Sequence, residues 1–206
     1  MLERHFHHLI ANYLSEHHPL VNTQWGFQSG KGTVTALLAT TYDWFTHLEA
    51  GRDVGSVFFD LRKAFDTVSH RALMTKLQKL DVSPFILRWI CSYLTARQQK
   101  VVIGEESETI PVISGVLQGS VLGPLLFLIY IDDVARVSLS EGSTLVLYAD
   151  DMLLYRKIDS TEDLRYKETS IPLTIGQRRT TLPSMLQSAS TQRRREVFWS
   201  GTATSA

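Results

Sequence analysis

Residues 144–157 read TLVLYADDMLLYRK, and in this stretch two adjacent carboxylates, Asp150 and Asp151, separate two apolar runs. The runs consist of the aliphatic, β-branched and aromatic side chains that strands favour. The stretch therefore predicts a hairpin with strands over 144–149 and 152–157, turning at the acidic pair. Ionised carboxylates beside such strands are costly to desolvate unless they are paired or bind a cation.

A third carboxylate, Asp60, ends another predicted strand. Residues 54–60 form a short apolar run that is typical of a buried strand. If the strand ends meet, the carboxylates repel each other, and a divalent cation removes that repulsion. Mg²⁺ binds one or two carboxylates together with phosphate oxygens and waters, and two such ions about 3.5–4 Å apart assist phosphoryl transfer. The three carboxylates are therefore candidate metal ligands and catalytic residues.

Taken alone, an Asp-Asp pair is more often an ordinary hairpin turn, because Asp tolerates turn geometry well. A second pair in this chain, Asp132 and Asp133, follows an apolar helix predicted over residues 125–131. This second pair is most simply a feature of the helix end. The choice for Asp150 and Asp151 depends on the surrounding sequence.

Other periodic segments predict a mixed fold of helices and short strands. Gly51, Ser69 and Pro84 are typical of helix boundaries. Helices are predicted over residues 2–17, 33–50, 69–80 and 84–97 and from Val121 onward, and a hairpin over 99–103 and 109–113.

Bulk composition sets only wide bounds on function. The chain has 21 basic and 21 acidic residues, so its net charge neither favours nor excludes a nucleic-acid partner. A single cysteine, Cys91, cannot form an internal disulfide, and no apolar run is long enough to span a membrane. We expect an intracellular protein, nuclear or cytoplasmic, with no membrane partner.

The composition changes after about residue 168. Residues 169–206 are rich in Ser, Thr and Arg, and Glu196 is the only acidic residue among them. We therefore divide the chain into a domain over residues 1–165 and a basic, disordered tail over 166–206.

Four segments of the chain form an ordered set of motifs. They are residues 24–33, QWGFQSGKGT, residues 58–68, FFDLRKAFDTV, residues 115–124, GVLQGSVLGP, and residues 148–151, YADD. In this order they resemble the fingers motif and the first, second and third palm motifs of the reverse transcriptase of non-LTR (LINE-type) retrotransposons. The resemblance covers residues 1–165.

The resemblance implies an α/β (α+β) polymerase palm, with an antiparallel sheet backed by helices and a partial helical fingers region. The family's thumb is missing, so we expect a domain truncated at both ends. The implied activity is RNA-directed DNA polymerisation by two-metal nucleotidyl transfer, weak or absent in the fragment alone. The implied cofactors are two Mg²⁺ ions, for which Mn²⁺ can substitute. The implied partners are an RNA template, a DNA primer and deoxynucleotides.

By the same resemblance, Asp60, Asp150 and Asp151 are the catalytic metal ligands, and the backbone carbonyl of Leu61 lies near a metal. Three departures accompany the match, since the family usually has Arg, Pro and Asn at positions 28, 117 and 132 of this sequence.

The nucleotide-binding residues implied are Ala64, Phe65 and Gln118, and the template-binding residues are Gly119 and Ser120. Phe65 stands where the family has an aromatic gate against the ribose 2′-hydroxyl. Without the family, an aromatic residue at this position is more often part of the core.

Two alternative functions stay open. One is a non-catalytic retroelement relic that binds nucleic acid, for example through its arginine-rich tail. The other is an RNA-directed RNA polymerase, against which Phe65 argues, since an RNA-synthesising enzyme must accept the 2′-hydroxyl.

Overall fold

The computed structural model describes residues 2–136, 139, 142–159 and 195–199. The chain forms two compact units, each built from two separate parts of the sequence. The first unit comprises Met1–Leu20 and Lys63–Asp132, and the second comprises Val21–Arg62 and Asp133–Ala206. Helices and antiparallel sheets occur together, so the predicted mixed fold is confirmed.

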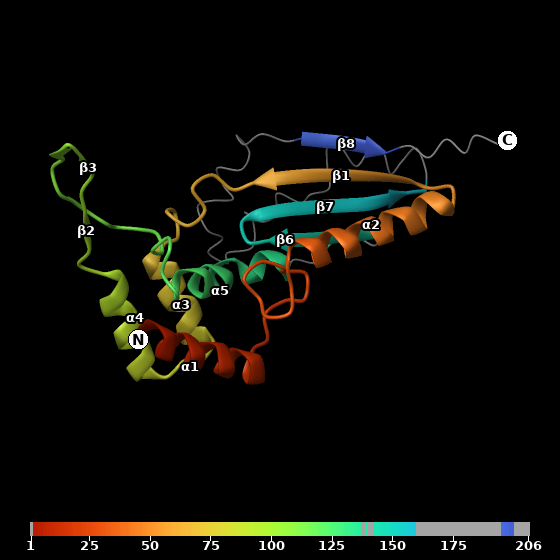
Figure 1. The fold of residues 1–206 in the computed structure, drawn as a ribbon. Coiled ribbons are helices and arrows are strands. Elements are labelled where there is room, and N and C mark those ends of the chain that lie inside the picture. Colours follow the sequence, from red (N-terminus) through yellow and green to blue (C-terminus); the bar gives the residue numbers. More distant parts are fainter. Residues whose placement is uncertain (1, 137–138, 140–141, 160–194, 200–206) are drawn as a thin grey trace. The chain divides into compact units, whose positions relative to one another are not determined.

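The second unit contains a four-stranded antiparallel sheet (Figure 1). Its strands lie in the order β6 (Ser143–Tyr148), β7 (Asp151–Ile158), β1 (Asp53–Asp60) and β8 (Arg195–Trp199). The β6–β7 hairpin and the β1 strand were both predicted from their apolar runs. The predicted burial of β1 is only partly right, because Val54 is 1% exposed but Phe58 is 41% exposed. The strand thus becomes more exposed towards Asp60.

The fourth strand, β8, differs from the sequence prediction. Residues 195–199 were assigned to a disordered tail, but they pair with β1 from Val54↔Trp199 to Phe58↔Arg195. Val197, Phe198 and Trp199 favour strands, and a strand edge offers unpaired backbone groups to such a segment. The other positions of the predicted tail lie outside the described residues.

Helix α2 (Thr33–Glu49) packs against β1 and β6. The Tyr155 hydroxyl on β7 donates a hydrogen bond of 2.8 Å to Asp43 Oδ2 on α2. The Trp44 ring meets the Tyr155 ring edge-on, with 5.8 Å between centroids. This buried tyrosine therefore links the helix to the middle of the sheet, and burial together with Asp43 raises its pKa.

The first unit is mainly helical and is organised around α5. The Ser69 hydroxyl accepts a hydrogen bond of 3.3 Å from the Ala72 amide and begins a helix as predicted. The helices of this unit begin at or next to the predicted boundaries, except the last, which begins at Gly123 and not at the predicted Val121. They are α1 (Leu2–His17), α3 (His70–Lys79), α4 (Pro84–Leu94) and most of α5 (Gly123–Ala135). The rings of Phe6 and Trp89 stack with 3.8 Å between centroids, which packs α1 on α4. Helix α4 ends three residues before the predicted Arg97.

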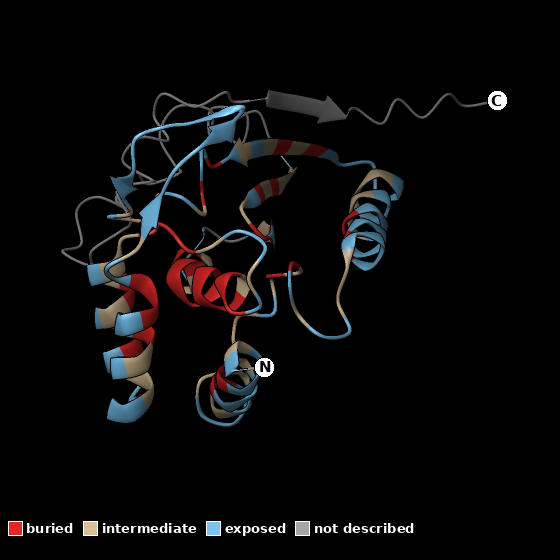
Figure 2. Cartoon of the chain, turned by 60° about the vertical axis from the view of Figure 1, so that its left-hand side comes forward, coloured by how far each residue is buried: buried red, intermediate tan, exposed pale blue. Residues whose placement is uncertain are grey.

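Helix α5 is buried on almost all sides (Figure 2). A helix that is apolar all round belongs in a protein core. Asp132 and Asp133 lie inside the last turn of α5, which continues to Ala135. The prediction that they follow the helix is therefore wrong by one turn, although their place at the helix end is as expected.

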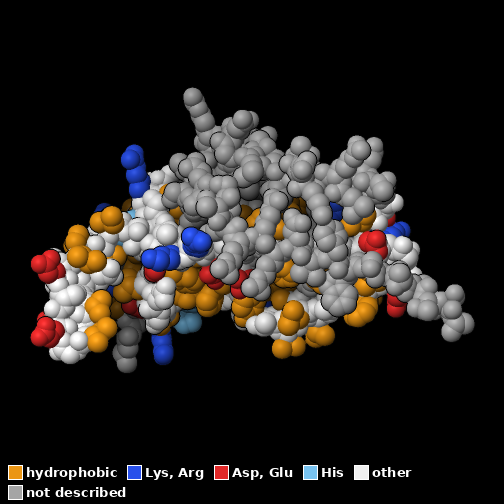
Figure 3. Space-filling model, turned by 90° about the horizontal axis from the view of Figure 1, so that it is seen from above, with side chains coloured by type: hydrophobic (Ala, Val, Ile, Leu, Met, Phe, Trp, Pro, Cys, Tyr) orange, Lys and Arg blue, Asp and Glu red, His pale blue; other side chains and the backbone are white. Residues whose placement is uncertain are grey.

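A pair of short two-stranded ladders forms the predicted hairpin after α4. Strand β2 (Gln98–Gln99) pairs with β5 (Ile110–Pro111), and β3 (Val102–Ile103) pairs with β4 (Glu105–Glu106). The turn is tighter than predicted, since residues 105–106 are in a strand and Gly104 has a φ of 75°. At this projecting tip, exposed apolar side chains lie beside carboxylates (left end of Figure 3).

Among the described residues, no helix is both long and apolar enough to cross a membrane.

We predict that Tyr155→Phe lowers the free energy of unfolding by about 1–2 kcal/mol, because the change leaves the Asp43 carboxylate without its hydroxyl donor. Urea unfolding measures the difference. Tyr42→Phe, at a 77% exposed position on the same helix, is the matched control and should change stability by less than about 0.5 kcal/mol. Equal effects of the two substitutions would contradict a stabilising role of the Tyr155–Asp43 hydrogen bond.

Candidate functional site

Two of the predicted metal ligands meet across paired strands of the second unit. Asp60 is the last residue of β1 and Asp151 is the first residue of β7, and the register pairs them directly. Side chains of directly opposed residues share a face, with Cβ atoms about 4.5–5.5 Å apart. The predicted meeting of these two carboxylates at adjoining strand ends is thus confirmed, while their catalytic role stays a prediction.

Asp150 lies in the loop that joins the two strands of the hairpin. Tyr148 pairs with Asp151, so the loop consists of Ala149 and Asp150. The prediction placed the turn at Asp150 and Asp151, one residue too late. Ala149 has a φ of 56°, a left-handed conformation that non-glycine residues rarely adopt. The turn is therefore strained at the residue next to the acidic pair.

The electrostatics of the three carboxylates favour a cation. Burial raises the pKa of Asp151, and the charges of Asp150 and Asp60 raise it further. Asp151 therefore lies within electrostatic range of both Asp60 and Asp150. A divalent cation would offset both the lost solvation and the repulsion.

The carboxylates suit a cation that completes its coordination shell with waters and substrate oxygens. Within the described residues, no three His, Cys, Asp or Glu side chains converge closely enough to hold a metal ion by themselves. Mg²⁺ is usually held by one or two carboxylates, with waters and substrate phosphates supplying the rest. The pair Asp60 and Asp151, with Asp150 beside it, fits this pattern. The Leu61 side chain is buried directly after β1, and the role of its carbonyl stays a prediction.

The predicted nucleotide-binding residues belong to the first unit. Ala64 is buried, and the half-buried Phe65 ring stacks on Phe127 of α5 with 4.5 Å between centroids and 14° between planes. One face of Phe65 therefore packs on the core, as the alternative interpretation expected. Because the ring is only half-buried, part of it stays accessible, and its role as a gate stays a prediction.

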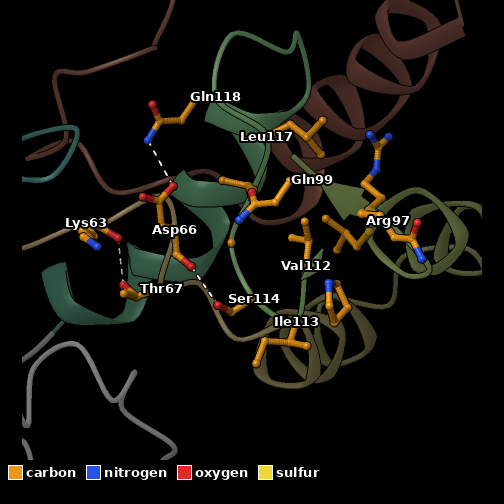
Figure 4. A pocket seen from close by; sticks show the side chains of 15 residues that line it. Lys63, Asp66, Thr67, Arg97, Gln99, Val112, Ile113, Ser114, Leu117 and Gln118 are labelled. Atoms are coloured by element: carbon orange, nitrogen blue, oxygen red, sulfur yellow. Dashed lines mark hydrogen bonds between the residues drawn. The ribbon is translucent and has the colours of Figure 1, made fainter. Parts of the chain in front are cut away.

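Gln118 lies in the loop before α5, beside the first palm motif. Its amide nitrogen donates a hydrogen bond of 3.2 Å to Asp66 Oδ1 (Figure 4). The backbone carbonyl of Asp66 also accepts a hydrogen bond of 2.9 Å from the Ser114 hydroxyl. Gly115 lies against the same residue, since a Cβ there would come within 2.9 Å of Asp66 Cα. Asp66, which sequence reasoning did not single out, thus joins the first and second palm motifs.

The two predicted template-binding residues follow Gln118. Gly119 has a φ of 78° and open space where a side chain would be. The Ser120 hydroxyl accepts a hydrogen bond of 2.9 Å from the Gly123 amide and donates one of 2.8 Å to the Leu117 carbonyl. This hydroxyl therefore shapes the entry into α5, and contact with a template stays a prediction for the backbone of both residues.

A cavity of about 680 Å³ opens beside Gln118 in the first unit. The first and second palm motifs contribute Lys63, Asp66 and Gln118 to its lining, and the β2–β5 ladder contributes Gln99 and Pro111 (Figure 4). Because Val116 and Leu117 also line it, the cavity combines polar and apolar side chains.

The chain matches the family model described as reverse transcriptase (RNA-dependent DNA polymerase) over residues 1–171. The chain therefore belongs to this family. Within it, the chain is similar to polymerases of non-LTR retrotransposons, as the four motifs predicted. One relative is the probable RNA-directed DNA polymerase from transposon X-element of Drosophila melanogaster, 34% identical over 70% of this chain and 17% of the relative.

Further comparisons agree with this assignment. The RNA-directed DNA polymerase from mobile element jockey of Drosophila funebris is 34% identical over 69% of this chain and 16% of its own length. The retrovirus-related Pol polyprotein from type-1 retrotransposable element R2 of Popillia japonica is 32% identical over 77% of this chain and 24% of its own length. The chain thus spans about a sixth to a quarter of these relatives.

Telomerase from Candida tropicalis, solved in complex with a fragment of telomeric RNA, has a similar fold. The TM-score is 0.62 at 13% identity, and the match covers 99% of this chain and 34% of the telomerase. This likeness supports the predicted palm-type polymerase fold.

We predict that Asp151→Asn raises the free energy of unfolding at neutral pH, by up to about 1 kcal/mol because the site is solvent-screened. The raised pKa means that the folded protein binds a proton at Asp151 more readily than the unfolded chain does. Protonation therefore favours the fold below the ordinary pKa of 3.8, and this contribution is lost as pH rises through the raised pKa.

Urea unfolding of the wild type and of Asp151→Asn, at neutral pH and near pH 3.8, checks the sign of the difference in the free energy of unfolding. The extra stability of the variant should shrink at the lower pH. Mg²⁺ should stabilise the wild type more than the variant, since a ligand stabilises the state that it binds. A variant less stable than the wild type at neutral pH would show that these carboxylates do not repel.

Proposed function

We propose that this chain carries the catalytic carboxylates of an RNA-directed DNA polymerase of the non-LTR retrotransposon type. The supporting observation is the direct pairing of Asp60 with Asp151, with Asp150 in the adjoining turn. The family supplies the reaction class, in which a primer 3′-hydroxyl attacks the α-phosphate of a deoxynucleoside triphosphate along an RNA template and pyrophosphate leaves.

Asp60, Asp150, Asp151 and the carbonyl of Leu61 would hold the divalent cations. When bound, two such ions stabilise the charge on the attacking and leaving oxygens of an in-line displacement. The protein's own contribution is to hold like charges together at the ends of β1 and β7. The sheet would hold these side chains rigidly, because β1 and β7 are paired along their length. Preorganised charge of this kind lowers the barrier without rearrangement during the reaction.

Phe65 and Gln118 would position the incoming nucleotide. A phenyl ring occupies the volume of a ribose 2′-hydroxyl and offers it no hydrogen bond, so it would favour deoxynucleotides. The stack on Phe127 would hold the ring in one orientation. The hydrogen bond from Gln118 to Asp66 would fix the Gln118 amide in the same way.

The whole polymerase activity is proposed for a protein of the relatives' length. Because this chain spans 17% of the X-element relative and 24% of the R2 relative, we propose that its activity alone is weak.

We predict that primer extension on an RNA template with Mg²⁺ falls at least about 100-fold in Asp60→Asn and in Asp150→Asn. The loss of a metal ligand removes several kcal/mol of transition-state stabilisation. Single-turnover extension with excess protein makes weak synthesis measurable. Asp132→Asn, in the other acidic pair, is the matched control and should keep wild-type activity. Synthesis that is equally strong in all four proteins would refute the proposal.

We further predict that Phe65→Val raises ribonucleotide incorporation, relative to deoxynucleotides, by at least about tenfold, because a smaller side chain leaves room for the 2′-hydroxyl. Extension with each nucleotide type gives the ratio of kcat/KM values. Phe127→Leu is the control for packing, since it weakens the same ring stack. It should lower stability and raise the ratio less than Phe65→Val does, because the Phe65 ring is still present. An unchanged ratio in Phe65→Val would assign Phe65 to the core alone.

A further inference from the structure

Gln24 is a buried polar residue in the loop between α1 and α2, with a side chain only 2% exposed. Its amide oxygen accepts a hydrogen bond of 2.8 Å from the Gly26 amide and one of 2.9 Å from the Ala149 amide. Its amide nitrogen donates a hydrogen bond of 3.3 Å to the Ala149 carbonyl. Gln24 therefore binds both polar backbone groups of the residue that precedes the acidic pair.

The backbone around Gln24 extends the edge of the sheet. The Leu147 amide donates to the Thr23 carbonyl at 2.8 Å, and the Trp25 amide donates to the Leu147 carbonyl at 2.7 Å. Gln24 and Leu147 form a parallel bridge, and Leu147 belongs to the edge strand β6. The loop is thus fixed to the strand that leads into the turn.

Gly26 makes this close approach possible. A Cβ at position 26 would lie 2.3 Å from the Ala149 nitrogen and 3.0 Å from its Cα. No side chain fits there without displacing the backbone of the turn. The loop from Gln24 to Gly26 therefore lies directly against Ala149.

The turn needs such support for two reasons. Ala149 has a φ of 56°, and a left-handed alanine is unfavourable unless its surroundings enforce it. In addition, the repulsion among Asp60, Asp150 and Asp151 favours any movement that separates them. The hydrogen bonds to Gln24 oppose both tendencies at the residue next to Asp150.

We propose that Gln24 is a positioning residue: its amide clamps Ala149 and so fixes the direction in which Asp150 and Asp151 present their carboxylates to a divalent cation. This inference rests on the proposed function of those carboxylates. An amide is required because it accepts from one backbone group and donates to the other. Glutamate at this position would lose the donor, oppose the Ala149 carbonyl with a negative charge and add a charge next to the acidic turn.

The test compares the full chain with Gln24→Leu and Gln24→Glu. Gln28→Leu is the matched control, because the Gln28 amide nitrogen has no hydrogen-bond partner among the described residues. Tyr155→Phe controls for general loss of stability in the same unit. Hydrogen exchange of the peptide over residues 147–152 reports on the turn, and titration with Mn²⁺ alone, followed by its paramagnetic signal, reports on the carboxylates.

We expect both Gln24 variants to exchange the Ala149 amide at least about tenfold faster, as the loss of a hydrogen bond would produce. Their Mn²⁺ affinity should fall by about 10–100-fold, as it does when partners that orient metal ligands are removed. Gln28→Leu should match the wild type in both measurements. Tyr155→Phe should lower the melting temperature without changing the Mn²⁺ affinity.

Two results would overturn the inference, and they are distinguishable. A wild-type chain that binds Mn²⁺, together with Gln24 variants that bind it equally well, would overturn the role of Gln24 and leave the proposed function intact. A wild-type chain that binds no Mn²⁺ would overturn both the proposed function and the inference built on it.

Discussion

Like-charge repulsion at the end of the sheet is the constraint around which the second unit is organised. Pairing of β1 with β7 puts Asp60 opposite Asp151, and the turn adds Asp150 beside them. Nothing in this arrangement stabilises the fold by itself, since two like charges directly opposed weaken a strand pair. The stability must come from elsewhere, and the apolar strands, α2 and the Tyr155–Asp43 hydrogen bond supply it. The site therefore uses stability that the rest of the unit provides.

Much of this could be predicted from the sequence because it depends on local patterns. The hairpin follows from two apolar runs around an acidic pair, and the helix starts follow from Ser69 and Pro84. The meeting of Asp60 with Asp151 is a tertiary fact that local patterns do not contain. Resemblance to a family supplied it, because the motifs in their order fix which strands must pair. The α5 helix illustrates the limit of periodicity, since a helix that is apolar all round predicts burial but not a partner.

The features that sequence reasoning missed depend on contacts between segments that are far apart in the sequence. Gln24 was quoted as part of a motif, yet nothing in its spacing shows that it binds Ala149, 125 positions away. Asp66 was passed over because its hydrogen-bond partners, Ser114 and Gln118, lie 48 and 52 positions away in the sequence. The strand at 195–199 was missed because its pairing depends on the open edge of β1, whereas its neighbours in the sequence are polar. One signal was available near Gln24. Gly26 follows two residues later, and a glycine often marks a point where another part of the backbone approaches closely.

In each unit, separately, a glycine of one loop lies against the backbone of another loop. Such contacts explain why the motifs are longer than their chemistry requires. In the second unit Gly26 lies against Ala149, and in the first unit Gly115 lies against Asp66. Each glycine lets one loop contact the backbone of another, where any Cβ would clash. A polar side chain then fixes the contact, Gln24 in one case and Asp66 in the other. Residues that would touch a cation or nucleotide are thus a minority within the first and second palm motifs. The others hold the backbone where those few side chains can act, so a substitution at Gly26 or Gly115 would move the site without altering any reactive group.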